Sequence, residues 1–586
     1  MNTSKINSLI ILSQIALILM TISACATSNN NNNNNKEVTI NIIETTDIHG
    51  NYFPYDFIKM KPSNGSLARV QTYLKEQREE FGDNIVLLDN GDILQGQPTA
   101  YYYNFIETKQ EHLAASILNY MGYSASSVGN HDVEAGPDVY YRWAEDYDFP
   151  VLAANIINNE TGEPAFKPYT IIEKEGVKIA VLGMITPAIP SWLPEQLWKG
   201  LSFRDMQETA EEWLPIIYKK EKPDLVIGLF HAGQQGTILD GVKENPSMEI
   251  AKEVEGFDIV LMGHDHRREN ITVANSAGDS VLVMNAECYG NYIASIEARF
   301  QLRKGKVVEK SLKGELINTN KYSPDEEYLD KFKNEYQAIS NFVIEKIGYI
   351  DQTISSKDAY FGSSKFIDFI HSLQMRLTGA DLSFCSPLSF VSEIKEGNIT
   401  ISDMFSLYKY ENFLYTMSLS GQEIKDHLEY SYQKWVHQMQ KPEDDFLVLD
   451  HPEDDNERAK FKYPLYNFDS AFGIIYTVDV TKPQGKKITI QSMADGTPFD
   501  LNKTYKVAIN SYRGNGGGEL LTKGAGIPKD QLAKRVITST DKDMRYYIIQ
   551  YIKENKNIQI QDYNHWSFIP EDLVQPAKKR EYAKLF

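Results

Sequence analysis

The sequence predicts an α/β protein of two domains joined by a helix, and three observations lead to this prediction. The chain has 586 residues, which is too many for one hydrophobic core. Its first half alternates short apolar runs with amphipathic helical patterns, which is typical of a layered α/β domain. Its second half follows a helical segment and has an order of strands and helices of its own.

The apolar runs of the first half are predicted to be strands buried on both faces, because they are short and rich in β-branched residues. These predicted strands cover residues 38–43, 84–88, 179–184, 224–230, 258–262 and 281–284. Periodic apolar residues predict helices over 67–79 and 111–120 between them.

Capping signals locate helices further along the chain. Ser323 as a cap, Pro324 at the first helical position and acids in the first turn predict a linker helix that runs to about residue 347. Ser402 is predicted to cap a short helix, and Ser420 forms a capping box with Glu423. Another helix is expected over 365–377, with strands over 380–384, 415–419, 474–480 and 505–510.

The N-terminus has the features of a secretory signal. Lys5 precedes an apolar run over 6–22, and small residues lead to Cys25. This cysteine resembles that of the lipobox of bacterial lipoproteins, which implies a lipid on Cys25; a plain signal peptide or a signal anchor is the alternative. We therefore expect a signal peptide over 1–24 and a lipidated flexible linker over 25–36, which contains an unbroken asparagine run. The expected location is the cell envelope, periplasmic or at the cell surface, with the lipid as the only membrane contact.

Charge and cysteine content restrict the partners and the architecture. A net charge of −20 argues against a nucleic-acid duplex as partner, because phosphate backbones attract basic surfaces. A small phosphate ester remains compatible with that charge, because bound metal ions dominate the local field. Cys288 and Cys385 are far apart in sequence and are expected to be buried free thiols, with one disulfide as the alternative.

Aspartate and histidine residues follow the predicted strands of the first half. In open α/β sheets, ligands gather at the carboxyl ends of strands. The residues in question are Asp47, His49, Asp92, Asn130, His131, Asp132, His231, His264 and His266. Each cluster alone also fits a polar turn or a helix cap. Five clusters in order within one half favour a single site.

The residue types indicate divalent metals. Carboxylates and imidazoles are ligands for such ions, and a set of seven ligands suits two ions better than one. The spacing Asp47-x-His49 is expected to put both side chains on one side of an extended segment, and His264-x-His266 is expected to do the same.

The ordered motifs resemble those of the calcineurin-like metallophosphoesterase superfamily. Together with the second half they resemble the bacterial 5'-nucleotidase and 2',3'-cyclic-nucleotide 2'-phosphodiesterase family, from about residue 38 to the C-terminal region. The resemblance implies a four-layer metallophosphoesterase β-sandwich flanked by helices over 37–320. It also implies a linker helix over 321–348 and a C-terminal α/β nucleotide-binding domain over 349–586.

The resemblance also implies roles for the clustered residues. One metal would be held by Asp47, His49, Asp92 and His266, and the other by Asp92, Asn130, His231 and His264, with Asp92 bridging. His131 and Asp132 would form a catalytic dyad in which Asp132 orients the ring of His131. Manganese, zinc, cobalt and iron all suit these ligands.

Two aromatic segments of the second half resemble the family's base-binding motifs. Tyr410 and Tyr512 are predicted to clamp the base, with Asn412 and Asp469 as polar contacts. Core packing or surface exposure is the alternative for each tyrosine. Because the two halves would supply different parts of the site, a large hinge rotation is expected to bring base and metals together.

One departure from the family pattern bears on the substrate. Classical 5'-nucleotidases carry an arginine after the strand that 381–384 would match, whereas this chain reads Cys-Ser-Pro-Leu-Ser-Phe over 385–390. This favours 2',3'-cyclic nucleotides and 3'-nucleotides as substrates of a monomeric hydrolase. The alternatives are a 5'-nucleotidase or UDP-sugar hydrolase, and a non-catalytic nucleotide-binding surface lipoprotein.

Overall fold

The computed structural model describes residues 35–236, 238–239, 241–450 and 459–586. The predicted signal peptide and Cys25 lie outside the described residues. The first strand already begins at Asn35, so the last two residues of the predicted linker are part of a strand. Within the described part of the chain, every helix is too short or too polar to cross a membrane.

Two six-stranded sheets form the centre of the first half. The first has the order β18-β17-β1-β4-β5-β6 and the second the order β15-β16-β14-β11-β9-β8. The strands of the first sheet are β1 (Asn35–Thr45), β4 (Ile85–Asp89), β5 (Ala125–Ser127), β6 (Val151–Leu152), β17 (Tyr292–Arg303) and β18 (Lys306–Asn318). Those of the second are β8 (Tyr169–Lys174), β9 (Val177–Ile185), β11 (Leu225–His231), β14 (Ile259–Met262), β15 (Arg268–Ala274) and β16 (Ser280–Ala286).

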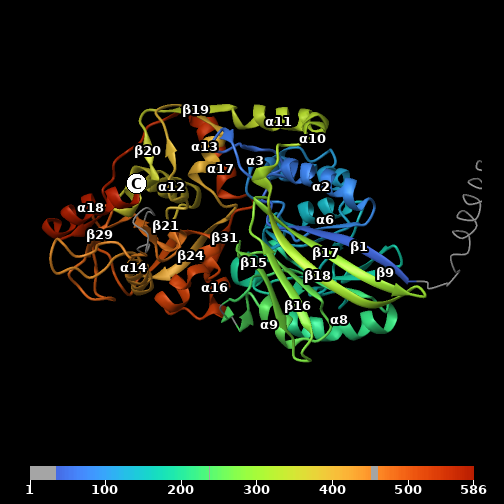
Figure 1. Cartoon of the computed structure of the whole chain (residues 1–586). Helices are drawn as coiled ribbons and strands as arrows, with labels where there is room; N and C mark the ends of the chain where they lie inside the picture. The colour runs from blue at the N-terminus through green and yellow to red at the C-terminus, as the bar shows by residue number, and fades with distance from the viewer. Residues whose placement is uncertain (1–34, 237, 240, 451–458) are drawn as a thin grey trace, which may run out of the picture.

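The two sheets pack face to face with helices on their outer faces (Figure 1). Alternate residues of β1 enter different cores, because side chains of a strand point to opposite faces. Ile42 joins the core between the sheets, and Ile43 joins the core under the helices. Helices α2 (Leu67–Phe81), α4 (Leu113–Met121) and α6 (Pro137–Glu145) cover the first sheet, and α8 (Met206–Lys220) and α9 (Ser247–Glu253) the second. The expected four-layer β-sandwich flanked by helices is thus confirmed.

Strands that lead to the site run parallel. In the first sheet β1, β4 and β5 are parallel neighbours, and in the second β9, β11, β14 and β16 are. Their carboxyl ends therefore share one edge of the sandwich, where the polar clusters were expected.

The junction between the halves is a broken helix. Asp325 caps α10 (Glu326–Lys331) by accepting from the amide of Tyr328, so the predicted cap at Ser323 is wrong. A non-helical Phe332 separates α10 from α11 (Lys333–Val343), and β19 (Lys346–Ile350) follows. Both helices pack against the first half, because Tyr328 and Ile339 belong to its core.

The second half is built around a five-stranded sheet of order β27-β21-β30-β24-β31. Its strands are β27 (Ser470–Phe472), β21 (Leu382–Cys385), β30 (Thr504–Asn510), β24 (Leu414–Ser420) and β31 (Val536–Ser539). Helices α12 (Lys365–Thr378) and α17 (Met544–Asn555) pack in one core, and α14 (Gly421–Trp435) and α18 (Glu571–Leu585) in another.

The capping predictions for this half have mixed outcomes. The box at the start of α14 is confirmed, because Ser420 accepts from the amide of Glu423 and Glu423 accepts from that of Ser420. The cap of α13 (Ile401–Leu407) is Thr400 instead of Ser402, and Asp403 completes its box. Among the described cysteines, Cys288 and Cys385 are both buried and free, as expected.

Candidate active site

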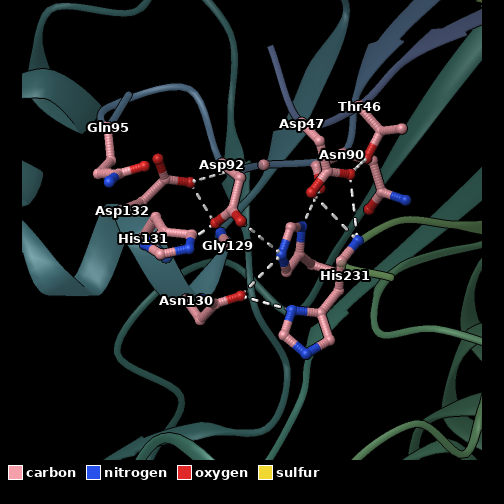
Figure 2. Close-up of polar contacts among 12 residues, drawn as sticks. Thr46, Asp47, Asn90, Asp92, Gln95, Gly129, Asn130, His131, Asp132 and His231 are labelled. Atoms are coloured by element: carbon pink, nitrogen blue, oxygen red, sulfur yellow. Dashed lines mark hydrogen bonds and ion pairs between the residues drawn. The ribbon is translucent and has the colours of Figure 1, made fainter. Parts of the chain in front are cut away.

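The predicted metal ligands converge at the carboxyl ends of the parallel strands. Asp47 and His49 lie just after β1, Asp92 lies after β4, and His231 is the last residue of β11. Asn130 begins the short helix α5 (Asn130–Glu134) after β5. His264 and His266 follow β14. Figure 2 shows the side chains of Asp92, Asn130 and His231 turned toward one another, with Asp47, His131 and Asp132 around them.

One group of donors consists of Asp47, His49 and His266. Nε2 of His266 lies 3.1 Å from Oδ1 of Asp47 and 3.1 Å from Nε2 of His49. Two donors that bind one ion at about 2.1 Å lie about 3 Å apart, so this spacing fits a shared cation.

A second group consists of Asp92, His231 and His264, with Asn130 beside them. Nε2 of His231 lies 3.3 Å from Oδ2 of Asp92 and 3.1 Å from Oδ1 of Asn130. The same Asn130 oxygen lies 2.7 Å from Nδ1 of His264. Oδ2 of Asp92 is also 3.9 Å from Nε2 of His49, so Asp92 lies between the two groups.

The other ring nitrogens of His49, His231 and His264 have partners that leave the converging nitrogens free for a cation. Nδ1 of His49 donates to the carbonyl of Gln95 at 3.2 Å, and Nδ1 of His231 donates to that of Asn90 at 2.6 Å. Nε2 of His264 lies 3.3 Å from the carboxylate of Glu244. Such outer contacts fix the tautomer and orientation of metal-binding histidines. The donor set therefore fits two divalent ions.

Five of the candidate metal ligands have left-handed backbone. The extended geometry predicted for the Asp47-x-His49 and His264-x-His266 segments is therefore wrong. φ is 51° at Asp47, 49° at His49 and 57° at Asp92. His264 and His266, with φ of 72° and 53°, send their side chains to different donor groups. Left-handed backbone is uncommon for residues other than glycine and clusters at functional sites. Two backbone hydrogen bonds stabilise this conformation: the amide of Asp47 donates to the carbonyl of Gly91, and the amide of His49 donates to the carbonyl of Asp92.

Glycine is needed where two of the loops touch. A Cβ on Gly129 would lie 2.2 Å from Oδ1 of Asp92, so a side chain there would displace this carboxylate. The glycine before Asn130 therefore permits the close approach of the β4 and β5 loops.

His131 pairs with Glu134, and the predicted dyad with Asp132 is wrong. Nδ1 of His131 contacts Oε2 of Glu134, one helical turn away in α5. The carboxylate of Asp132 instead accepts the backbone amides of Gly129, Asp92, Ile93 and Leu94 at 2.8–2.9 Å, a set partly drawn in Figure 2. Helical spacing puts residue 134, but not residue 132, on the face of residue 131. The spacing His-x-x-Glu in the sequence could have revealed this pair.

The surroundings of His131 favour its charged form. Burial lowers the pKa of His131, but the carboxylates of Asp92 and Glu134 outweigh burial and raise the pKa to about 9. The backbone amide of His131 also donates to Oδ1 of Asp92 at 2.8 Å. This bond connects the His131–Glu134 pair to Asp92, which lies between the two donor groups. A charged imidazole at this position can stabilise negative charge on a phosphate.

A cavity of about 980 Å³ connects this centre to the second half of the chain. Asn130, His131, Glu134 and His264 line it on one side, and Tyr410, Asn412 and Tyr512 line it on the other. Both predicted clamp tyrosines thus share one cavity with His131 and with two of the candidate metal ligands, Asn130 and His264.

A third tyrosine of the cavity was missed in the sequence. The ring of Tyr466 meets that of Tyr410 at 6.1 Å and 87°, and that of Tyr512 at 5.7 Å and 88°. Both are edge-to-face contacts, which are favourable between aromatic rings. Tyr466 lies in the short 3-10 helix η5 (Leu465–Asn467), which is too short for a periodic pattern to mark it.

The prediction that Asp469 contacts the substrate is wrong. Its carboxylate is buried and accepts from Nε of Arg513 at 2.8 Å and from Nε2 of His427 at 2.9 Å. Burial raises the pKa of Asp469, but Arg513 and His427 outweigh burial and hold the pKa at about 2. Arg513 also donates to the carbonyls of Tyr466 and Gly517. Asp469 therefore stabilises the loop that carries Tyr512.

Comparison with protein families matches two separate regions of the chain. Residues 40–268 match the model of the calcineurin-like phosphoesterases, and residues 346–523 match that of the 5'-nucleotidase C-terminal domain. The first region contains all the candidate metal ligands, and the second contains Tyr410 and Tyr512.

Several known proteins resemble the chain over most of its length. It is 26% identical over 593 residues to the trifunctional nucleotide phosphoesterase protein YfkN of Bacillus subtilis. This alignment covers 91% of this chain but only 39% of the length of YfkN. It is 23% identical to the 2',3'-cyclic-nucleotide 2'-phosphodiesterase/3'-nucleotidase of Yersinia enterocolitica, over 93% of this chain and 90% of that protein. A structure of a putative 5'-nucleotidase from Staphylococcus aureus shares the fold, with a TM-score of 0.72, 19% identity and coverage of 90% and 99% of the two chains.

Proposed function

We propose that the chain hydrolyses 2',3'-cyclic nucleotides and 3'-nucleotides to nucleoside and phosphate. It is a metallophosphoesterase with a 5'-nucleotidase C-terminal domain, and thus a phosphoric ester hydrolase. Hydrolysis of nucleotide phosphoesters in general agrees with the names of its relatives. One observation carries the proposal: His131, two of the candidate metal ligands (Asn130 and His264) and the tyrosines line a single cavity.

The cavity wall supports the choice of substrate. Its lining includes Leu388, from the segment in which a classical 5'-nucleotidase would carry arginine. A 5'-nucleotidase or UDP-sugar hydrolase is the second candidate, favoured by the match of residues 346–523 to the 5'-nucleotidase C-terminal domain. A non-catalytic binding protein is disfavoured because the donor set is complete.

Seven side chains of the site would hold two divalent ions. Asp47, His49, Asp92 and His266 would hold one divalent ion, and Asp92, Asn130, His231 and His264 the other. Two such ions supply a water activated for attack on phosphorus and neutralise charge on the phosphate. Manganese, zinc, cobalt and iron all fit the donors, and we propose manganese for the first assays.

His131 faces the phosphate from the cavity wall. In the charged form that its partner Glu134 favours, its ring stabilises the negative charge that develops on the phosphate, and its proton is available to the leaving ribose oxygen. Glu134 orients the ring through Nδ1. Tyr410 and Tyr512 hold the base, which places the ribose between them and His131.

Location and assembly are part of the proposal. The apolar N-terminal run and Cys25 support export and lipid anchoring to the cell envelope. We propose that the chain acts as a monomer.

A substrate comparison tests the proposal. The metal-free protein is reloaded with manganese, and kcat/KM is measured for 2',3'-cyclic AMP, 3'-AMP and 5'-AMP. The proposal predicts clear preference for the first two. Preference for 5'-AMP would support the second candidate, and metal binding without hydrolysis of any of them would support a binding protein.

A further inference from the structure

A fully buried arginine holds the segment that carries Tyr410. Arg545 is the second residue of α17 and is 0% exposed. Its Nε donates to the carbonyl of Tyr408 at 3.2 Å, and its Nη2 donates to that of Lys409 at 2.7 Å. Its Nη1 donates to the carboxylate of Glu411 at 3.2 Å.

The start of α17 adds a fourth bond to the same segment. The amide of Met544 donates to the carbonyl of Asn412 at 2.8 Å. Donors from two consecutive residues thus fix the backbone on both sides of Tyr410. Fork-shaped donors such as guanidinium fix geometry as well as charge, which a lysine in the same place cannot do.

The faces of the same guanidinium contact aromatic rings from both halves of the chain. It lies 4.1 Å from the ring centre of Phe405 in α13 and 5.1 Å from that of Tyr101 in α3 (Pro98–Tyr101). The rings of Tyr101 and Phe405 meet at 5.3 Å and 90°. Tyr101 thereby joins a core cluster built mainly by the second half. Figure 1 shows α3, α13 and α17 together at the junction.

Tyr101 is in turn tied to the metal-binding loops. The hydroxyl of Thr99, two residues earlier, donates to the carbonyl of Gly50. The amide of Gln97 donates to the carbonyl of His49 at 3.0 Å. A short chain of contacts therefore runs from the His49 loop through Tyr101 and Arg545 to Tyr410.

A buried ion pair at this place needs an explanation beyond stability. Well-packed apolar residues usually stabilise a core as well as a buried ion pair does. Fixing one geometry is the best-supported use of such pairs. Here the geometry that Arg545 fixes is the position of the base-binding tyrosine relative to the metal-binding half.

We propose that Arg545, with Tyr101 against its face, is a positioning residue for the nucleotide: it holds Tyr410 at a fixed place relative to the metal centre. The inference rests on the proposed function, because it concerns the base of a nucleotide. Small phosphate esters without a base would not depend on Arg545.

Two variants and one control test this inference on the manganese-loaded protein. R545K keeps the charge but loses the fork, and Y101L keeps apolar volume but loses the ring. The control R535K changes a second arginine–glutamate pair of the same domain, in which Nη2 of Arg535 lies 2.8 Å from Oε1 of Glu423. Each protein is assayed with 2',3'-cyclic AMP and with p-nitrophenyl phosphate, which has no base or ribose.

R545K and Y101L are expected to raise KM for the nucleotide about tenfold with kcat changed less than about twofold, and to leave kcat/KM for the aryl phosphate unchanged. R535K is expected to behave like the wild type on both substrates. The ratio between the two substrates is independent of the folded fraction, so a loss of stability does not obscure the result. Adenosine binding to the metal-free protein, measured by calorimetry, is expected to weaken about tenfold in R545K.

The contrary results are distinct. If both substrates lose the same factor, or neither is affected, Arg545 is only structural and the inference is wrong. If the wild type hydrolyses the aryl phosphate but no nucleotide, the proposed function fails and the inference fails with it.

Discussion

Asp132 and Glu134 are neighbours in one short helix, and their replacement is expected to have opposite effects. Oδ2 of Asp132 accepts the amides of Asp92 and Gly129, and Oδ1 accepts those of Ile93 and Leu94. In Asp132→Asn an NH2 group replaces one of these oxygens, so two buried amides lose their acceptor. Each bond to a charged group contributes about 1.5–3 kcal/mol, so the loss is about 3–6 kcal/mol of unfolding free energy.

Glu134→Gln leaves those amide bonds intact and removes the charge next to His131. Because an oriented, charged imidazole contributes through general acid catalysis, kcat is expected to fall about 100-fold with little change in stability. Thermal unfolding and kcat for the preferred nucleotide are measured for both variants. Asp138→Asn, at an exposed position of the next helix, is the control.

The opposite pattern would refute this reasoning. If Asp132→Asn lost kcat at unchanged stability and Glu134→Gln changed neither, Asp132 would be the partner of His131 after all.

Three further predictions follow from the site. Alanine at Tyr410 or Tyr512 is expected to raise KM about 5- to 100-fold by loss of base stacking, with kcat little changed; equal KM values would exclude the clamp. Removal of metal with a chelator is expected to abolish hydrolysis and to lower the unfolding temperature, both restored by manganese, because ions that bind only the folded state stabilise it; activity that survives chelation would contradict the metal site. The pKa of Asp469 is depressed to about 2, so its contribution to stability is present above about pH 4 and lost as the pH falls toward 2. Asp469→Asn should reduce stability at pH 7 more than at pH 2.5, and an equal loss at both would exclude the ion pair with Arg513.

The fold was predictable because its main signals are local. Short β-branched runs gave the parallel strands that end at Thr45, Asp89 and His231, and a complete capping box located α14. Caps were less certain, because several acceptors compete at a helix start: Asp325 and Thr400 act where Ser323 and Ser402 were predicted.

The site residues were brought together by the order of the strands, but their geometry was not predictable from spacing. The extended model for Asp47 and His49 failed, because loop contacts impose left-handed backbone on both. Asp469 was predicted to contact the substrate, but its carboxylate accepts hydrogen bonds from Arg513 and His427. Tyr466 could not be predicted, because only the fold brings its ring into contact with Tyr410 and Tyr512, which are distant in sequence.

A crystal structure of the manganese-loaded protein with adenosine and phosphate would test the central claim most directly. It is predicted to show two ions that share Asp92, with the adenine ring against Tyr410 and Tyr512 and the phosphate next to His131. A single ion, or adenosine bound away from these tyrosines, would contradict the proposal that this cavity is a dinuclear nucleotide phosphoesterase site.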